Sequence, residues 1–188
     1  MHRLVFVTHP EVLIDPDVAI EDWGLSETGR RRAAGFATSD AMRDVCRIWS
    51  STERKARETA QLLASTRGLS VSEHPDLGEN DRRATGFLPR PQFEAAADAF
   101  FAQPAQSFRG WETAIHAQQR IAGAVRAILA RKDAGDVAIV SHGAVGTLLY
   151  CHLSGLEIDR RHDQPAQGHF WTAQLPDLRP LHGWQPIH

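Results

Sequence analysis

Short apolar runs alternate along this chain with longer stretches in which apolar residues recur every three or four positions. Most of the short runs have the length and continuity of strands buried on both faces of a sheet. They lie at residues 4–8, 45–49, 69–71, 137–140 and 168–175. The periodic stretches predict helices at about residues 25–37, 51–67, 92–102, 112–132 and 144–153. This alternation predicts an α/β fold, a three-layer sandwich in which helices cover both faces of a mostly parallel sheet.

No linker or internal repeat divides the chain, so residues 1–188 are expected to form one domain. Residues 76–112 are less regular and contain three prolines, which indicates a small cap-like insertion. Residues 176–188 also contain three prolines and are expected to be a tail that extends over the surface.

Composition narrows the possible partners. The chain has 21 Lys and Arg, 23 Asp and Glu, and a formal net charge of −2. Without a basic field or a polybasic block, it is not expected to bind nucleic acid or a membrane surface. Cys46 and Cys151 lack metal-ligand spacing and are expected to be small buried residues in a reducing compartment. With no region typical of a signal peptide, the cytoplasm is the expected location.

Two histidines follow two of the predicted strands. His9 comes after the apolar run 4–8, and His142 comes just after the run 137–140. Open α/β sheets bind ligands outside the carboxyl ends of their strands. Pro10 favours an extended backbone at His9, and Gly143 allows a tight turn from strand to helix. The paired placement predicts a site built from both ends of the chain.

A third candidate segment lies at residues 50–60, where a strand ends and a helix begins. Ser50 and Glu53 have the spacing of a capping box. Arg54 and Lys55 fall in the first helical turn, where free N–H groups and the helix dipole favour an anion. Alone, this stretch is equally well explained as a solvated basic face.

Short motifs then follow one another in a recognisable order. They read THP at 8–10, WGLSETG at 23–29, STERKARETA at 51–60, LGE at 77–79, WET at 111–113 and SHG at 141–143. In order and spacing they resemble the phosphoglycerate-mutase-like branch of the histidine phosphatase superfamily. Its patterns are R-H-G, W/L-T-x-x-G, S-x-x-x-R-A-x-x-T-A, L-x-E, G/W-E-S/T and S-H-G. The resemblance covers residues 4–175, and Arg120 follows the fifth motif along the same predicted helix.

The resemblance implies catalytic roles for three residues. His9 is the nucleophile that forms a phosphohistidine, Glu79 is the acid and later the base, and His142 holds the transferring phosphoryl group. A neutral imidazole can attack phosphorus and divide the transfer into two easier steps. A nearby carboxyl can protonate the leaving oxygen. The resemblance implies no metal and no other cofactor, with a small phosphorylated substrate or a phosphate ion as the ligand.

The chain departs from the family at the phosphate site. Thr8 and Lys55 stand where the family has arginines, and Pro10 stands where it has glycine. Arginine binds phosphate through two N–H groups, whereas lysine acts as a point charge. Neighbouring cations could compensate for these losses. The candidate phosphate-binding residues are therefore Thr8, Arg54, Lys55, Arg82 and Gly143.

Several functions stay open at this point. The first hypothesis is a metal-independent phosphatase that hydrolyses a small phosphorylated metabolite through a phosphohistidine on His9. The alternative is a catalytically weak or inactive member that binds an anionic ligand or a protein partner, because the phosphate site is altered. A metal-dependent hydrolase using His9, His142 and His169 has no short-range ligand spacing in its favour. A mutase is less favoured because the chain is short. The substrate and the oligomeric state are not predicted.

Overall fold

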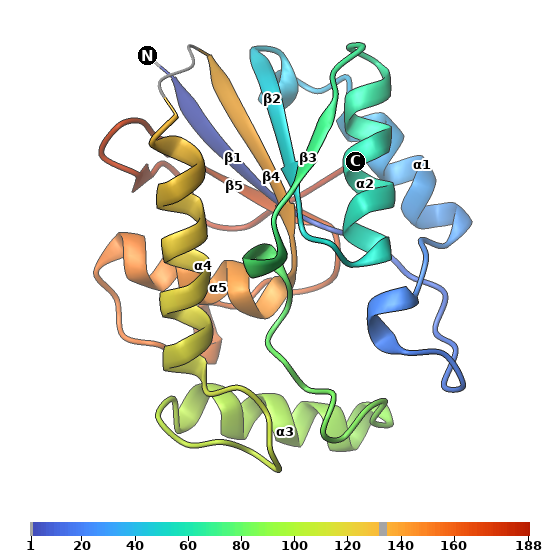
Figure 1. Cartoon of the computed structure of the whole chain (residues 1–188), viewed down its shortest axis with the longest axis vertical. Helices are drawn as coiled ribbons and strands as arrows, with labels where there is room; N and C mark the ends of the chain where they lie inside the picture. Colours follow the sequence, from blue (N-terminus) through green and yellow to red (C-terminus); the bar gives the residue numbers. More distant parts are fainter. Residues whose placement is uncertain (1, 132–134) are drawn as a thin grey trace.

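A central sheet with helices on both faces forms the frame of the molecule (Figure 1). The computed structural model describes residues 2–131 and 135–188. The strand order along the main path of the sheet is β3-β2-β4-β1-β5-β6. The four parallel strands are β1 (Arg3–Thr8), β2 (Val45–Ser50), β3 (Val71–Glu73) and β4 (Asp136–Ser141). Strand β5 (His169–Gln174) runs antiparallel to β1.

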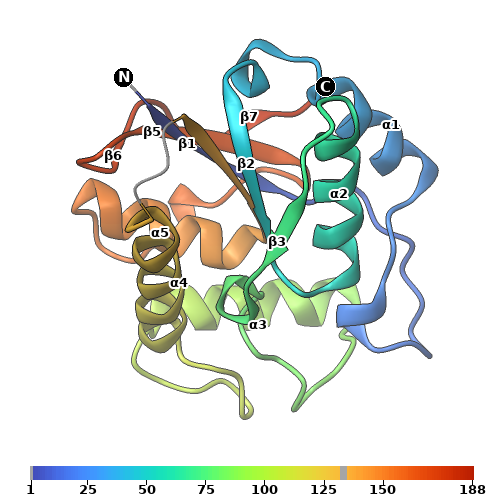
Figure 2. The same cartoon turned by 45° about the horizontal axis from the view of Figure 1, so that its top comes forward.

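The helices divide between the two faces of the sheet, as Figures 1 and 2 show from two directions. Helices α1 (Glu27–Phe36) and α2 (Arg54–Ser65) pack against each other on one side. Helices α4 (Ala114–Leu129) and α5 (Gly143–Ser154) pack together on the other. Helix α3 (Arg90–Ala102) lies across the end of the molecule to which the parallel strands point. The predicted three-layer α/β sandwich is confirmed. The predicted end of the long helix, residue 132, lies outside the described residues.

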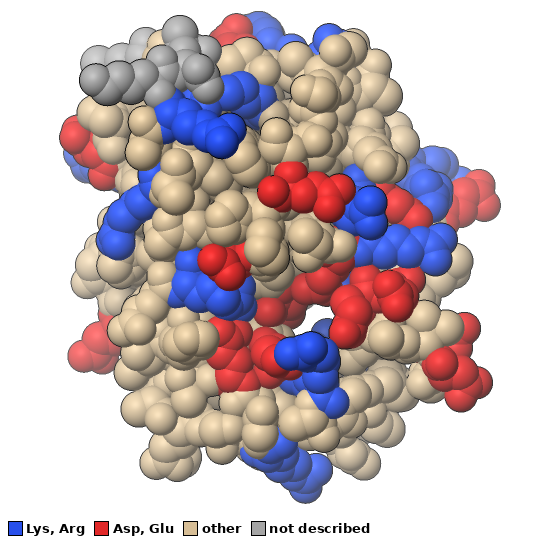
Figure 3. All heavy atoms as spheres, in the orientation of Figure 1, with Lys and Arg blue, Asp and Glu red and all other residues tan. Residues whose placement is uncertain are grey.

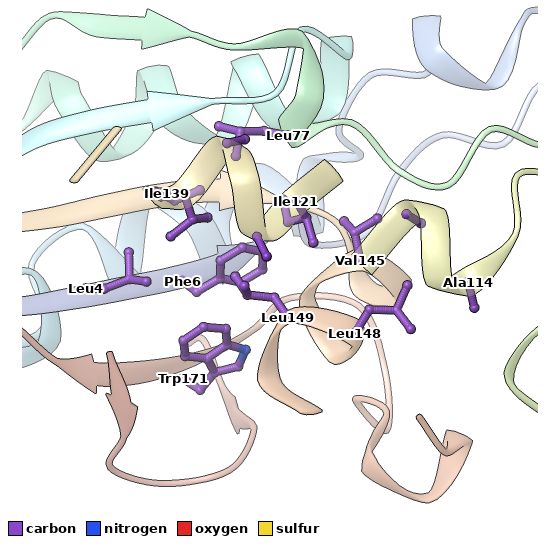
Figure 4. Packing of buried hydrophobic residues seen from close by; sticks show 14 of the residues in the cluster. Leu4, Phe6, Leu77, Ala114, Ile121, Ile139, Val145, Leu148, Leu149 and Trp171 are labelled. Atoms are coloured by element: carbon purple, nitrogen blue, oxygen red, sulfur yellow. The ribbon is translucent and has the colours of Figure 1, made fainter. Parts of the chain in front are cut away.

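The central strands are buried because their side chains meet a core on each face. On the α4–α5 side, the Phe6 ring stacks on that of Trp171 with centroids 4.9 Å apart and planes only 4° from parallel. Figure 4 shows this pair beside Leu149 of α5. On the α1–α2 side, Val5 and Val7 join a second apolar cluster. Burial on both faces explains why β1 reads as an unbroken apolar run.

The C-terminal residues form part of the fold, so the prediction of a surface extension is wrong. Strands β6 (Arg179–Pro180) and β7 (Gln185–Pro186) pair with β5. The side chain of Ile187 is fully buried, and the Trp184 ring lies 6.3 Å from that of Trp171. Arg32 of α1 donates hydrogen bonds to the carbonyl of Ile187. Prolines indicate a tail, but they are also compatible with two-residue edge strands.

Two further predictions can be compared with the structure. The segment 76–112 contains α3 and otherwise consists mostly of loops and turns. Cys151 is buried, but Cys46 is exposed, so the expectation of a buried residue is wrong at Cys46. Cys46 lies at the start of β2, where the sheet has an irregular register, rather than in its fully covered centre.

Within the described part of the chain, no helix is long and apolar enough to cross a membrane.

The burial of Ile187 gives a first prediction. Replacing Ile187 with Ala should lower the free energy of unfolding by about 2–5 kcal/mol, because it removes a buried side chain and leaves a cavity. Urea denaturation measures the change. Leu181, which is 52% exposed, is the matched control. Leu181→Ala should change stability by no more than about 0.5 kcal/mol. Equal effects of the two substitutions would contradict the packed tail.

Candidate active site

Two buried histidines meet at the carboxyl ends of β1 and β4. The parallel register pairs Thr8 with Ser141, and the backbone N–H of His9 donates to the Ser141 carbonyl at 3.2 Å. The next residues, His9 and His142, are therefore neighbours, with ring centroids 5.3 Å apart and planes inclined by 65°. His9 is 8% exposed and His142 is fully buried.

The immediate surroundings of His9 determine which ring nitrogen can react. Its Nδ1 lies 2.9 Å from the carbonyl oxygen of Pro10. A carbonyl only accepts hydrogen bonds, so the neutral ring carries its proton on Nδ1 and its free electron pair on Nε2. Burial, followed by the positive charge of Lys55, lowers the pKa of His9 to about 4. At neutral pH the Nε2 atom is therefore available as a nucleophile.

The side chain of Glu79 reaches the N-terminus of α5. Its carboxyl oxygens accept the backbone N–H groups of Val145 at 3.1 Å and Ala144 at 3.3 Å. Burial raises the pKa of Glu79, and the charge of Arg82 and the hydrogen bond from Val145 only partly oppose that shift. Arg120 of α4 fixes the same segment by donating to the carbonyls of Gly78 and Glu79, both at 3.1 Å. The result is a fixed carboxyl group that retains a proton to higher pH than an exposed one.

Glu53 connects the third predicted segment with both of these groups. Its Oε2 accepts a hydrogen bond from Lys55 Nζ at 2.5 Å, and its Oε1 accepts the N–H of Glu79 at 2.8 Å. The same Oε1 lies 3.3 Å from Nε2 of His142. Burial opposes ionisation of Glu53, but His142 and Lys55 lower its pKa to about 2. The Glu53 carboxylate is thus the central anion of the site. Burial lowers the pKa of His142 itself well below its usual value.

A cleft of about 790 Å³ opens beside these residues. Figure 3 shows the hollow, bordered by both acidic and basic side chains. Glu53, Glu79 and Arg82 belong to its wall. Because Glu53 also contacts His142, it connects the cleft with the buried histidine pair. Among the described residues, no group of three or more His, Cys, Asp or Glu side chains is arranged to hold a metal ion.

Comparison with known proteins identifies the family and the fold. Residues 5–171 match the model of the histidine phosphatase superfamily (branch 1). The chain belongs to that superfamily. No curated protein matches it, but solved structures of the same fold do.

Three of these structures show how closely the fold of this histidine phosphatase superfamily member is shared. Mycobacterial glucosyl-3-phosphoglycerate phosphatase has a TM-score of 0.84 at 22% identity, with all of both chains covered. The same protein complexed with VO3 has a TM-score of 0.81 at 23% identity, covering 99% of this chain and 100% of that one. YhfR of Bacillus stearothermophilus has a TM-score of 0.81 at 22% identity, covering 97% and 95%. At these identities the likeness shows the fold alone.

In this superfamily member the last residue of β1, Thr8, has an uncharged side chain. Thr8 is fully buried, and its hydroxyl lies 2.7 Å from Oε1 of Gln164 while accepting the N–H of His169 at 3.0 Å. A Cβ at Gly143 would lie 2.5 Å from Nε2 of Gln164. Gly143 therefore gives room to Gln164, so a neutral amide occupies the space beside the Thr8 hydroxyl.

The predicted cations lie in three different settings. Lys55 is 3% exposed and is paired with Glu53. The Arg82 guanidinium lies 4.9 Å from the centroid of the Phe93 ring and, within residues 2–131 and 135–188, donates no hydrogen bond to the protein. Arg54 lies away from the two histidines, since its side chain is exposed and bonded to Glu58 at 2.9 Å. It does not line the main cleft.

The structure thus groups the residues predicted for catalysis, but their catalytic roles stay predictions. It also adds two residues that the sequence analysis missed. The sequence predicts a capping box between Ser50 and Glu53, whereas Glu53 is the N-cap residue of α2 and its side chain turns to Lys55. The signal for Glu53 in the sequence is that a carboxylate is unexpected inside a motif that binds phosphate. Gln164 had no such signal, because it lies in an irregular segment.

The burial of His9 gives a second prediction. In the folded protein its imidazole should titrate near pH 4, and in urea-unfolded protein it should titrate near its ordinary value of 6.5. NMR of the imidazole resonances, assigned by comparison with His9→Asn, measures both values.

The same shift affects stability. Between pH 6.5 and 4 the unfolded chain binds the His9 proton and the folded chain does not, so acidification through this range should destabilise the protein. His9→Asn should remove part of that loss. A folded-state titration of His9 near pH 6.5 would contradict the described burial.

Proposed function

We propose that this chain is a metal-independent phosphatase that hydrolyses a small phosphorylated metabolite through a phosphohistidine on His9. The main support is the hydrogen bond between Nδ1 of His9 and the carbonyl of Pro10, which leaves the electron pair on Nε2. Membership of the histidine phosphatase superfamily agrees with this proposal. Glu79, whose carboxyl group is held by the N–H of Val145 and whose own N–H is bonded to Glu53, would be the proton donor.

In the first step, Nε2 of His9 attacks phosphorus and the bond from phosphorus to the leaving oxygen breaks. Glu79 begins protonated, in keeping with its raised pKa, and gives its proton to the leaving oxygen. His142 lies 5.3 Å from His9 between ring centroids, near enough to contact the phosphoryl group during transfer. Positioning and hydrogen bonds to the equatorial oxygens supply most of the catalysis in such reactions.

In the second step, the Glu79 carboxylate takes a proton from a water molecule. The water oxygen attacks phosphorus, and the bond from phosphorus to Nε2 of His9 breaks. Inorganic phosphate leaves, and His9 and Glu79 return to their starting states. The step needs no group beyond water and these side chains.

The charges around the cleft narrow the proposed substrate. Six carboxyl groups and three guanidinium groups line it, belonging to Asp17, Glu21, Glu53, Glu79, Asp81, Glu112, Arg82, Arg83 and Arg120. Glu79 begins protonated, and Glu53, Asp81 and Glu112 are each paired with a cation, so Asp17 and Glu21 outnumber the remaining charge of Arg82. One solved neighbour is a glucosyl-3-phosphoglycerate phosphatase, but a leaving group with its own carboxylate would be repelled here. We therefore expect a metabolite whose leaving group is neutral or positively charged.

A second candidate function is anion binding with weak or no turnover. It is favoured by one observation, that Thr8 and Gln164 place uncharged groups at the end of β1. Each lost charge-assisted hydrogen bond to a phosphoryl group costs about 1.5–3 kcal/mol. If those bonds act in the transition state, the rate falls by roughly ten- to a hundredfold for each.

Turnover of two phosphate esters separates the two functions and tests the assigned roles. His9→Asn should reduce kcat/KM for p-nitrophenyl phosphate by at least about a thousandfold, because the nucleophile is lost. Glu79→Gln should reduce kcat for phosphoethanolamine by about a hundredfold or more. It should affect p-nitrophenyl phosphate much less, because nitrophenolate leaves without a proton.

The matched control is Glu73→Gln, which removes a carboxylate that is paired with Arg57 on the surface. Its kinetics should equal those of the wild type. Absence of turnover above His9→Asn, on these esters and on a panel of phosphorylated metabolites, would exclude the phosphatase and favour the anion-binding alternative.

A further inference from the structure

The Glu53 carboxylate uses donors that face the buried end of the site. It accepts hydrogen bonds from Lys55 Nζ and from the N–H of Glu79, and it lies 3.3 Å from Nε2 of His142. The ammonium of Lys55 and the amide of Glu79 donate to Glu53, whereas Nε2 of His142 has its hydrogen bond with Ser51 Oγ at 2.8 Å. All three are kinds of group that bind phosphoryl oxygens. The side chain of Glu53 is 16% exposed, so water screens these contacts only in part.

Lys55 has little capacity left for a second anion. Besides Glu53, its ammonium donates to the carbonyl of Ile20 at 2.7 Å, so two of its three N–H groups are used. The side chain is 4% exposed, and the charge of Glu53 cancels its own. Of the cations near the histidines, Arg82 is the one that has no carboxylate partner within the described residues.

We propose that Glu53 is an internal anion of this site, whose carboxylate competes with a phosphoryl group for Lys55 and so limits how tightly phosphate-like anions bind beside His9 and His142. The proposal rests on the proposed function only for the location of the phosphoryl group beside His9. On this proposal Glu53 determines how tightly anions bind and which charge of the substrate is preferred, since a phosphoryl group of low charge is repelled less than a dianion.

The competing explanation is that Glu53 only supports the site, by holding Lys55, His142 and the segment of Glu79 in place. The two roles predict opposite effects of removing the charge. If Glu53 competes, an uncharged side chain of the same shape frees Lys55 and anions bind more tightly. If Glu53 only supports, the same change loosens the donors and anions bind more weakly.

Calorimetric titration of the whole chain with inorganic phosphate, and separately with orthovanadate, distinguishes these roles. Glu53→Gln keeps the size of the side chain and an oxygen for the N–H of Glu79. It should lower the dissociation constant of both anions by about tenfold or more, because one like charge is removed at close range. Glu53→Ala is a second charge-removing variant, and thermal unfolding establishes that each variant is folded before titration.

Two further variants serve as controls. Glu53→Asp retains the charge and should not show the gain. Adding Lys55→Met to Glu53→Gln should abolish the gain, because the freed ammonium is then absent. Unchanged or weaker anion binding by the folded charge-removing variants would overturn the proposal.

Turnover is measured in parallel on the same samples, so that the two proposals can fail separately. Tighter anion binding in Glu53→Gln without turnover in any variant would overturn the phosphatase and leave the role of Glu53 intact. Turnover by the wild type, with no gain in anion binding on loss of the Glu53 charge, would overturn the role of Glu53 and leave the phosphatase intact.

Discussion

The parallel pairing of β1 with β4 is the constraint on which the site depends. It sets Thr8 opposite Ser141, and the residues that follow, His9 and His142, come together as the strands end. Because alternate side chains of a strand face opposite sides, a slip of one residue would turn the apolar set of β1 out of its core. The stacking of Phe6 on Trp171 and the full burial of β4 oppose such a slip. Packing far from the chemistry thus fixes the distance between the imidazoles.

Burial also sets the protonation states. It keeps both imidazoles neutral and Glu79 protonated to higher pH than usual, which suits attack by nitrogen and proton donation by the carboxyl group. The same dry surroundings make an unpaired charge costly, and Lys55 is accordingly paired with Glu53. This site is therefore less positive than its motifs indicate. The guanidinium of Arg82, which has no ion pair within residues 2–131 and 135–188, remains as a positive charge in the wall of the cleft.

The strands, the main helices and the grouping of His9, Glu79 and His142 could be predicted because their signals are local patterns placed in a shared order. The direction in which a side chain points at the start of a helix could not be predicted in this way. Arg54 and Lys55 are adjacent, yet the helical turn of about 100° per residue leaves Arg54 exposed beside Glu58 and turns Lys55 inward. The contact of Gln164 with Thr8 was equally out of reach, since it joins residues far apart in the chain through an irregular loop.

Trapping the covalent intermediate tests the central claim most directly. The protein is mixed with p-nitrophenyl phosphate, quenched in alkali within milliseconds to seconds, and digested under conditions that preserve phosphohistidine for mass spectrometry. A phosphoryl group on the peptide that contains His9, absent from His9→Asn, is the expected result. Turnover with no phosphorylated His9 at any quench time, or with the phosphoryl group on another residue, would contradict the assignment of His9 as the nucleophile.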